Sequence, residues 1–448
     1  MSGRATEALE KSLERIQAEN QKLTTFITVT DNQARADAEK ADAAESEGRG
    51  LGLLHGMPMA LKDNIDTAGI RTTSGAKFWS KRVPNDDAPV VKRLKAAGAI
   101  IVGKATLGEL VFDVRSYNPV VGHAINPWNE THSPGGSSGG SAAALAADMC
   151  VGALGSDTGG SVRIPAAFCG VSGLRPTHGA VPNIGATPVS VSNDTIGPMA
   201  RRVEDVARIF AVLVGYDVED PHSVDNTYGN FLPRLHDGVE GIKIGLPRNY
   251  FFENIDPEIE IAVHEGIEVF KELGAEFIEL DVPGAEQAQM HACIQIYCDA
   301  ANYHLQRLKN EPNAFSPPIY ERMKRGLEIS GIDYAASMRF KENWIRALRL
   351  VFDFVDIILC PTTPIPSLPL LDSPDLHELT TRTASLTYPG SLGSIPGLSI
   401  PCGFTSDGSP VGLMLQSAWW NEPLLLKAGC SYQSLTDWHI KRPSKGFG

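Results

Sequence analysis

The sequence contains few of the patterns that build disulfide frameworks or metal sites. It has seven cysteines in 448 residues, an odd number at scattered positions, with no Cys-x-x-Cys pair and no paired Cys or His spacing typical of zinc. Most of the cysteines lie among apolar neighbours, as in Ile358-Leu359-Cys360. We therefore expect buried free thiols in a reducing cytosol, and no metal or other cofactor.

Long apolar runs and basic runs are also absent. No stretch of 18 or more apolar residues occurs, so no membrane-spanning helix is expected, and the charged segment Thr6–Lys11 lacks the apolar region of a signal peptide. The formal net charge of −13 and the pI near 5.4 argue against a nucleic-acid or anionic-membrane surface. These absences predict a soluble cytoplasmic protein with neither nucleic acid nor membrane as a partner.

Apolar residues make up 42% of the chain, which is enough for a sizeable core, and their spacing alternates between helical and strand-like periods. The spacing predicts helices over 6–22, 33–48, 90–97, 142–147, 203–214, 257–273 and 424–434, and a largely helical stretch over 285–350. It predicts strands over 53–61, 99–102, 151–154, 242–246, 276–280, 356–359, 399–400 and 411–415. Such alternation is typical of a layered α/β fold, and the polar segment 218–240 is the one subdomain boundary that it indicates.

Two clusters of glycine and serine carry the strongest functional signal. They are Ser133–Ser141 and Gly155–Arg163, and each presents a serine among glycines. Upstream of both, Ala60–Asn64 contributes a lysine. A serine hydroxyl is a weak nucleophile that needs a base, and the nearby His132 and His178 lie in no recognisable catalytic context.

Lys62 is the alternative base. A free lysine has a pKa of about 10.4 and is protonated at neutral pH, but burial disfavours the charged form and lowers the pKa. Lys62 follows an apolar, strand-like segment, which would place its amine inside the protein near polar hydroxyls. The structural alternative is a surface lysine paired with Asp63.

The first cluster admits other interpretations. A phosphate-binding loop would explain the glycines and the helix behind them, but Gly135–Ser141 lacks the Gly-Lys-Ser/Thr ending of such loops. Gly135, Ser137 and Gly139 match the Gly-x-Ser-x-Gly nucleophile elbow, but that motif follows a strand and residues 129–134 do not resemble one. A flexible Gly/Ser turn would be the default interpretation if the second cluster were absent.

The run from Gly135 to Pro165 resembles the amidase signature family. Further matching segments, spread over nearly the whole chain and densest between residues 50 and 205, are Gly56–Asn64, Asn126–Asn129, Gly173–Thr177, Asp194–Pro198, Pro361–Pro364 and Pro410–Leu413. The order and spacing of these segments are highly specific. The resemblance implies an α/β fold, a single α/β/α layered domain over residues 1–448 with a large, mixed, twisted central sheet. Within it, 218–350 could form a substrate-cleft insertion or subdomain.

The resemblance also implies a Ser–cisSer–Lys triad. The lysine falls on Lys62, the bridging serine on Ser137 after a cis peptide bond, and the nucleophile on Ser161. In this scheme Lys62 accepts a proton from Ser137, Ser137 accepts one from Ser161, and Ser161 attacks the amide carbonyl. The implied oxyanion donors are the backbone N–H groups of Thr158, Gly159, Gly160 and Ser161.

Further residues are expected to have supporting or binding roles. Ser138 is expected to hydrogen-bond near the triad, with a plain turn residue as the alternative. Asp157 and Arg163 flank the nucleophile, and we favour a role in which they pair and brace its loop over one in substrate binding. The positions expected to line the substrate pocket are Phe112, Asp113 and Gly135. A segment that borders the substrate cleft in relatives holds Tyr320, Arg322 and Arg325. For that segment we favour a solvated, charged helix face.

The implied reaction is hydrolysis of the C–N bond of a small or medium carboxamide through an acyl-enzyme on Ser161. The alternative is the glutamine-hydrolysing subunit of a complex that amidates aminoacyl-tRNA, a role that related proteins have. Two observations favour the free hydrolase. Thr381–Ser394 has no acidic residue where the transferase pattern places one for the α-amino group of glutamine, and the chain ends soon after its last helix. We therefore expect a small-molecule amide as the partner, with a homodimer as a family-level expectation. A non-enzymatic phosphate-binding protein would require the triad match to be accidental.

Overall fold

One mixed β-sheet runs through the molecule in the computed structural model, which describes residues 3–49, 51–370 and 375–443. Over these residues eleven strands pair in the order β1-β3-β2-β4-β6-β5-β10-β11-β9-β7-β8. The strands are β1 (Phe26–Val29), β2 (Pro58–Lys62), β3 (Ile100–Ala105), β4 (Gly152–Asp157), β5 (Ser172–Arg175), β6 (Thr195–Ala200), β7 (Lys243–Pro247), β8 (Glu276–Leu280), β9 (Ile357–Pro361), β10 (Gly397–Phe404) and β11 (Pro410–Ser417). β2 runs parallel to β3 and β4, and β7 runs parallel to β8 and β9, whereas the other pairs are antiparallel.

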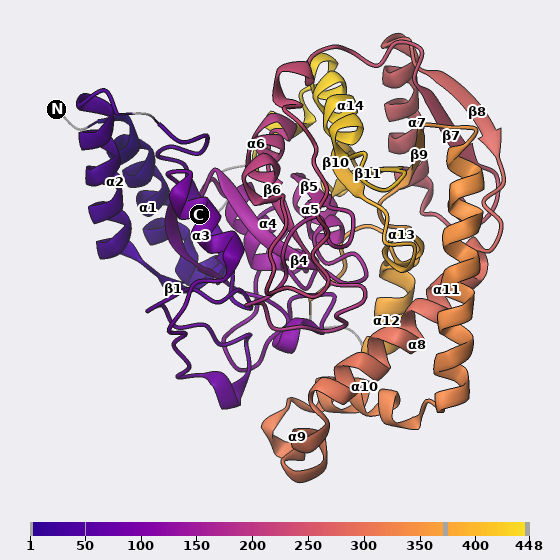
Figure 1. Cartoon of the computed structure of the whole chain (residues 1–448), viewed down its shortest axis with the longest axis horizontal. Coiled ribbons are helices and arrows are strands. Elements are labelled where there is room, and N and C mark those ends of the chain that lie inside the picture. Colours follow the sequence, from indigo (N-terminus) through magenta and orange to yellow (C-terminus); the bar gives the residue numbers. More distant parts are fainter. Residues whose placement is uncertain (1–2, 50, 371–374, 444–448) are drawn as a thin grey trace.

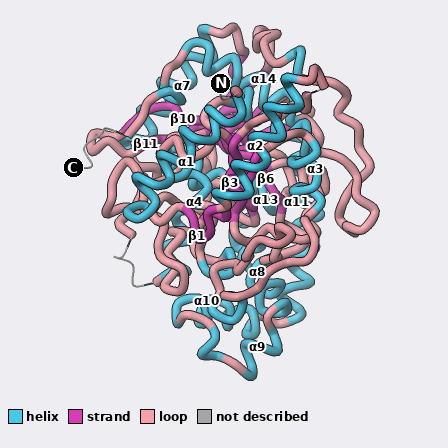
Figure 2. Tube along the Cα trace, turned by 90° about the vertical axis from the view of Figure 1, so that its left-hand side faces the viewer, coloured by secondary structure: helices cyan, strands magenta, loops and turns pink. Residues whose placement is uncertain are grey.

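Helices surround this sheet, as the views in Figures 1 and 2 show. They are α1 (Arg4–Leu23), α2 (Asp31–Ser46), α3 (Pro89–Ala96), α4 (Gly139–Ala146), α5 (Arg163–Cys169), α6 (Val203–Leu213), α7 (Pro257–Glu272), α8 (Ala285–Tyr303), α9 (Leu305–Asn310), α10 (Pro317–Glu328), α11 (Gly331–Phe352), α12 (Leu376–Thr383), α13 (Tyr388–Leu392) and α14 (Glu422–Leu435). The layered α/β fold and its large mixed sheet are thereby confirmed. None of the helices in the described ranges is long and apolar enough to cross a membrane.

The side chains of β2 and β4 alternate between two packing environments. Leu61 and Leu154 belong to the core that includes α3 and α6, whereas Ala60 and Ala153 belong to the core that includes α4. Small alanines suit this second core because α4 is a fully buried helix of glycine, serine, alanine and leucine. Successive side chains of a strand point to opposite faces, so Lys62 lies on the face of Ala60, beside the loop that leads into α4.

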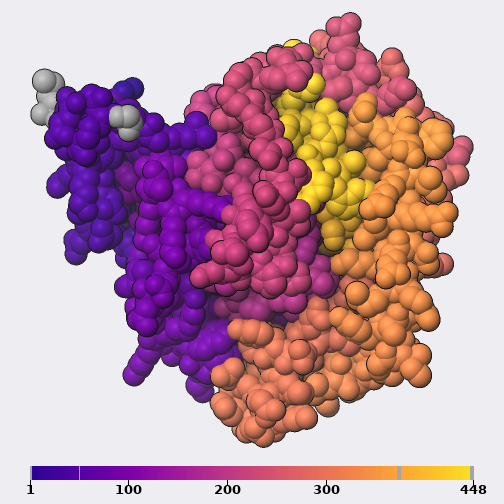
Figure 3. Space-filling model, viewed as in Figure 1, coloured from indigo at the N-terminus to yellow at the C-terminus, as the bar shows by residue number. Residues whose placement is uncertain are grey.

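The segment 218–350 is not separate from the rest of the sheet. Its strand β7 pairs with β9 and its strand β8 pairs with β7, so the two strands complete one edge of the common sheet. The part that stands out is helical: α8, α9 and α10 lie at the lower end of the molecule in Figures 1 and 2, and the same lobe is orange in the space-filling view of Figure 3. The protruding feature is therefore narrower than the segment that the sequence suggested.

Candidate active site

Lys62 lies at the end of β2 with its amine enclosed by protein. The side chain is fully buried, and Nζ donates hydrogen bonds to the Oγ atoms of Ser137 at 2.8 Å and Ser156 at 3.0 Å. Burial lowers the pKa of Lys62 well below 10.5, and the negative charges of Asp157 and Asp194 oppose this effect without cancelling it. The amine is therefore placed to be neutral and to accept a proton, rather than to form a surface ion pair.

The first Gly/Ser cluster brings Ser137 to this amine. The peptide bond between Gly136 and Ser137 is cis, as the resemblance implied. Gly136 has no room for a side chain, because a Cβ there would lie 2.3 Å from a backbone carbonyl oxygen. Ser138 joins the two clusters: its N–H donates to the carbonyl oxygen of Ser161 at 3.2 Å, and its Oγ donates to that of Ser156 at 3.2 Å. The two clusters therefore lie side by side in space.

Ser161, the expected nucleophile, is half-buried in the turn between β4 and α5, which we call the nucleophile turn (residues 157–161). In the described part of the chain no hydrogen bond joins its hydroxyl to that of Ser137, and catalytic hydrogen bonds commonly tighten only when substrate is bound. Gly160 already donates its N–H to Asp157 Oδ1 at 2.8 Å, so this expected oxyanion donor is in use. The remaining candidates are the N–H groups of Thr158, Gly159 and Ser161.

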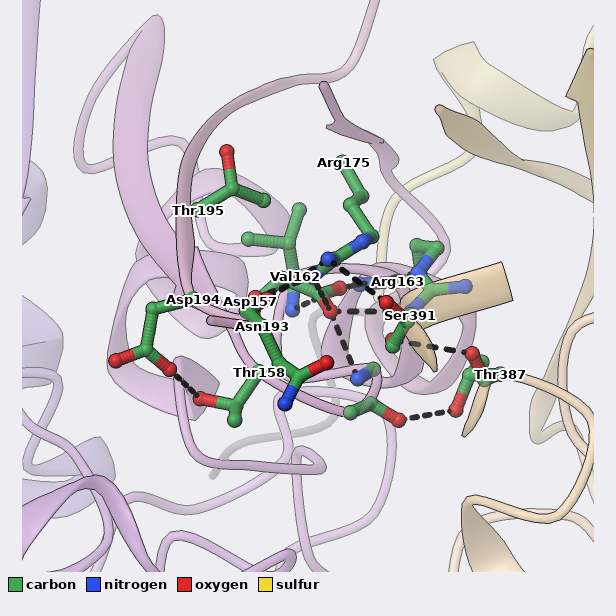
Figure 4. A network of polar contacts seen from close by, with 12 residues as sticks. Asp157, Thr158, Val162, Arg163, Arg175, Asn193, Asp194, Thr195, Thr387 and Ser391 are labelled. Carbon is green, nitrogen blue, oxygen red and sulfur yellow. Dashed lines mark hydrogen bonds and ion pairs between the residues drawn. The ribbon is translucent and has the colours of Figure 1, made fainter. Parts of the chain in front are cut away.

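An ion cluster beneath the nucleophile turn holds it in place, as Figure 4 shows. Asp157 is fully buried and pairs with Arg163 at 3.0 Å and with Arg175 at 3.1 Å. Burial alone would raise the pKa of Asp157, but the two guanidinium groups outweigh it and keep the pKa well below its usual range. Arg175 had no role among the sequence-based expectations, although it belongs to the matching segment Gly173–Thr177.

A cavity extends from Ser161 toward α10. Phe112 and Asp113, both expected in the substrate pocket, line this cavity. Gly135 does not: it packs against α5, where a Cβ would lie 2.8 Å from the Cα of Pro165. A second hollow of about 250 Å³ adjoins the cavity, and both are lined by Val111, Thr158 and Val189. In residues 3–49, 51–370 and 375–443 no group of three or more His, Cys, Asp or Glu could hold a metal ion.

Arg322 is buried, so the interpretation of a solvated helix face was wrong for this residue. It is 5% exposed, lies over the rings of Phe112 at 4.0 Å and Tyr297 at 5.3 Å, and donates to the Phe112 carbonyl oxygen and the Tyr297 hydroxyl. No carboxylate pairs with it among the described residues. Arg325, on the outer side, is half-exposed and lies 3.6 Å from Asp375. The two arginines differ because α10 is amphipathic and Arg322 belongs to its inward face.

Known proteins are similar to this chain over nearly its full length. The family model described as Amidase matches residues 7–426. A glutamyl-tRNA(Gln) amidotransferase subunit of Synechococcus sp. (strain JA-2-3B'a(2-13)) is 37% identical, and the alignment covers 99% of this chain and 91% of that protein. Among solved structures, a chain of a vestigial protein complex that reveals the evolutionary origins of an s-triazine catabolic enzyme superposes with a TM-score of 0.91 at 31% identity, covering 97% of this chain and 95% of that chain. A crystal structure of amidase has a TM-score of 0.85 at 29% identity, covering 97% of this chain and 96% of that chain.

These relatives overturn the expected set of partners. A small-molecule amide without nucleic acid was expected because the net charge is negative and no basic run occurs. The matched proteins, however, are named as one subunit of a glutamyl-tRNA(Gln) amidotransferase. The charge of one subunit does not determine the surface of an assembly, since companion subunits can supply the positive field. With a family model matching most of its residues and relatives above 30% identity over nearly all of its length, this protein belongs to the amidase signature family.

Proposed function

We propose that this protein is the amide-hydrolysing subunit of an amidotransferase-type assembly, and that it releases ammonia from the carboxamide of glutamine through an acyl-enzyme on Ser161. The single observation that carries the hydrolytic chemistry is the buried amine of Lys62, 2.8 Å from Ser137 Oγ. Similarity to amidotransferase subunits over 99% of this chain supports a role within an assembly.

The proposed reaction begins when neutral Lys62 accepts the proton of Ser137, which in turn accepts the proton of Ser161. Ser161 Oγ attacks the carboxamide carbon, and N–H groups of the nucleophile turn stabilise the oxyanion. The proton returns through Ser137 to the amide nitrogen, the C–N bond breaks and ammonia leaves. Water then adds to the acyl-enzyme by the same relay, which releases the carboxylate product and restores Ser161.

Arg322 supports a substrate that carries a carboxylate. A buried cation without an anionic partner is costly, and a carboxylate ligand would satisfy the guanidinium with charge-assisted hydrogen bonds. Arg322 and Ser161 line the same cavity. A glutamine whose carboxamide reaches Ser161 would therefore extend its α-carboxylate toward Arg322.

A carboxamide without an α-amino group is the second candidate substrate. Among the described residues that line the cavity, Asp113 is the one carboxylate, and Arg115 already pairs with it at 2.8 Å. The segment Thr381–Ser394 contributes Ala384 and Tyr388 to the lining, and neither is acidic. These lining residues therefore offer no unpaired carboxylate to the α-ammonium group of a glutamine. The likeness to a complex related to s-triazine catabolism also favours nitrogen compounds other than amino acids.

Three compounds of equal chain length separate these candidates. They are glutamine, 4-carbamoylbutanoate, which lacks the α-amino group, and pentanediamide, which also lacks the carboxylate. Ammonia release that is much faster from glutamine supports the first candidate, whereas equal or faster release from 4-carbamoylbutanoate supports the second. If neither is hydrolysed, by the chain alone or with companion subunits purified from its source cells, the proposed substrate class is refuted.

A further inference from the structure

Asp194 is a partly buried carboxylate beside the nucleophile turn, and the proposed relay does not use it. It precedes β6, and its Oδ1 accepts a hydrogen bond from Thr158 Oγ1 at 2.5 Å, as Figure 4 shows. Its Oδ2 accepts the backbone N–H groups of Val189 at 2.8 Å and Ser190 at 3.0 Å. One oxygen thus binds the nucleophile turn, and the other binds a loop that lines the hollow of about 250 Å³.

We propose that Asp194 is a positioning residue of this site, which holds Thr158 in the nucleophile turn and supplies a negative charge that acts on Lys62. The proposal rests on the proposed triad, but it does not depend on which amide is the substrate.

The positioning part follows from how the nucleophile turn is anchored. Asp157 is held by the two arginines, Thr158 by Asp194, and the carbonyl oxygen of Gly159 by Thr387 Oγ1 at 2.6 Å. Three successive residues are therefore fixed by side chains from outside the turn. Thr158 and Gly159 carry N–H groups that are candidate oxyanion donors, so a shift at Thr158 moves a donor away from the reacting atoms. A displacement of about 1 Å at such a site can cost about 10²-fold in rate.

The electrostatic part follows from the surroundings of the carboxylate. Burial raises the pKa of Asp194 to about 6, so the group is ionised above that pH. Asp194 and Ser156 line the same hollow, and Ser156 Oγ accepts a hydrogen bond from Lys62 Nζ at 3.0 Å, so the carboxylate lies near the amine. Its negative charge favours the ammonium form of Lys62 and therefore opposes the effect of burial on the lysine. Removing the charge would lower the pKa of Lys62 further, so that the amine becomes neutral at lower pH. In the part of the chain that the structure describes, the other titratable or charged groups around these two residues and the hollow include Asp157, Arg175, His178, Asp220, His222, Asp299 and Lys341.

The test measures the rate at which a fluorophosphonate reacts with Ser161 from weakly acidic to alkaline pH, with Ser161→Ala as the blank. Thr158→Val removes the hydroxyl and keeps the charge, so labelling should slow about tenfold with an unchanged pH dependence. Thr158→Ser should restore most of the rate. Asp194→Asn should slow labelling by about 10²-fold and shift the acidic limb of the profile to lower pH.

A matched control is Asp205→Asn, on α6 and in contact with Arg208 at 3.4 Å. It removes a carboxylate from a helix that packs in the core formed with α3. The labelling rate and its pH profile should therefore stay as in the wild type.

Wild-type rates in folded Asp194→Asn, or a slowed rate with an unshifted acidic limb, would overturn the proposal. If Asp194→Asn fails to fold, Thr158→Val decides, because a wild-type labelling rate in that variant also overturns it. Labelling of Ser161 without ammonia release from any of the three amides would refute the proposed substrate class and leave this inference standing. Absence of labelling in the wild-type protein would overturn both.

Discussion

Replacing Arg322 by methionine tests whether its guanidinium binds the carboxylate of the substrate. Methionine fills much of the volume of the arginine stem but carries no charge and no strong donor. In the structure the guanidinium is 5% exposed and donates to the Phe112 carbonyl and the Tyr297 hydroxyl. Removing one member of a buried, hydrogen-bonded charge pair costs about 3–4 kcal/mol. For a carboxylate substrate, kcat/KM should therefore fall by about 10²- to 10³-fold.

The assay compares kcat/KM for 4-carbamoylbutanoate and for neutral pentanediamide, in the wild type and in Arg322→Met. With the neutral amide only the hydrogen bonds to Phe112 and Tyr297 are lost, so the decrease should be about tenfold or less. The difference between the two substrates, about 2–3 kcal/mol, measures the coupling between guanidinium and carboxylate. Arg322→Lys, which keeps the charge but loses the planar fork, should lie between wild type and Arg322→Met.

Equal losses on the charged and the neutral amide would refute this reasoning. They would mean that Arg322 only supports the cavity wall through its contacts with Phe112 and Tyr297. A thermal unfolding curve for each variant shows whether the comparison is made on folded protein.

Three further predictions concern the triad and its support. Ser161→Ala should reduce ammonia release by at least about 10⁴-fold with an unchanged Tm, and substantial residual activity would rule out Ser161 as the nucleophile. The kcat/KM of the wild type should rise with pH through the lowered pKa of Lys62, as the amine loses its proton. The variant Lys62→Met should lose both the activity and this rise. If Lys62→Met kept the wild-type rate near neutral pH, Lys62 would be excluded as the base. Asp157→Asn should lower the free energy of unfolding by about 3–5 kcal/mol in urea titrations, because Arg163 and Arg175 then lie buried beside a neutral group. The pKa of Asp157 is depressed in the folded state, so its contribution is present above the unfolded carboxyl pKa of about 3.9 and is lost as pH falls below it. The stability gap between wild type and Asp157→Asn should therefore persist throughout the neutral range and narrow in acid, and a gap that does not depend on pH would contradict this assignment.

The sequence predicts helices and strands well where the spacing of apolar residues along the chain is regular. The helix predicted over 257–273 is α7 and the strand predicted over 276–280 is β8, because both have clear periodicity and no competing signal. Strand β6 was not predicted, since it contains Gly197 and Pro198, which have low strand propensity. It is held by pairing with β4 on one side and β5 on the other, and such pairing is not visible in the segment itself.

The family could be inferred from the amino-acid sequence alone, because its matching segments recur in a specific order and spacing, and the triad positions are a prediction from the same segments. The contacts of Lys62 with Ser137 and Ser156 agree with that inference. The groups that complete the site could not be inferred in this way. Arg322 looks like any charged residue on a helix, and Asp194 belongs to the matching segment Asp194–Pro198, which gives it no role. Whether such a charge lies in water or is enclosed beside the candidate site depends on what packs against it, and only the tertiary structure decides that.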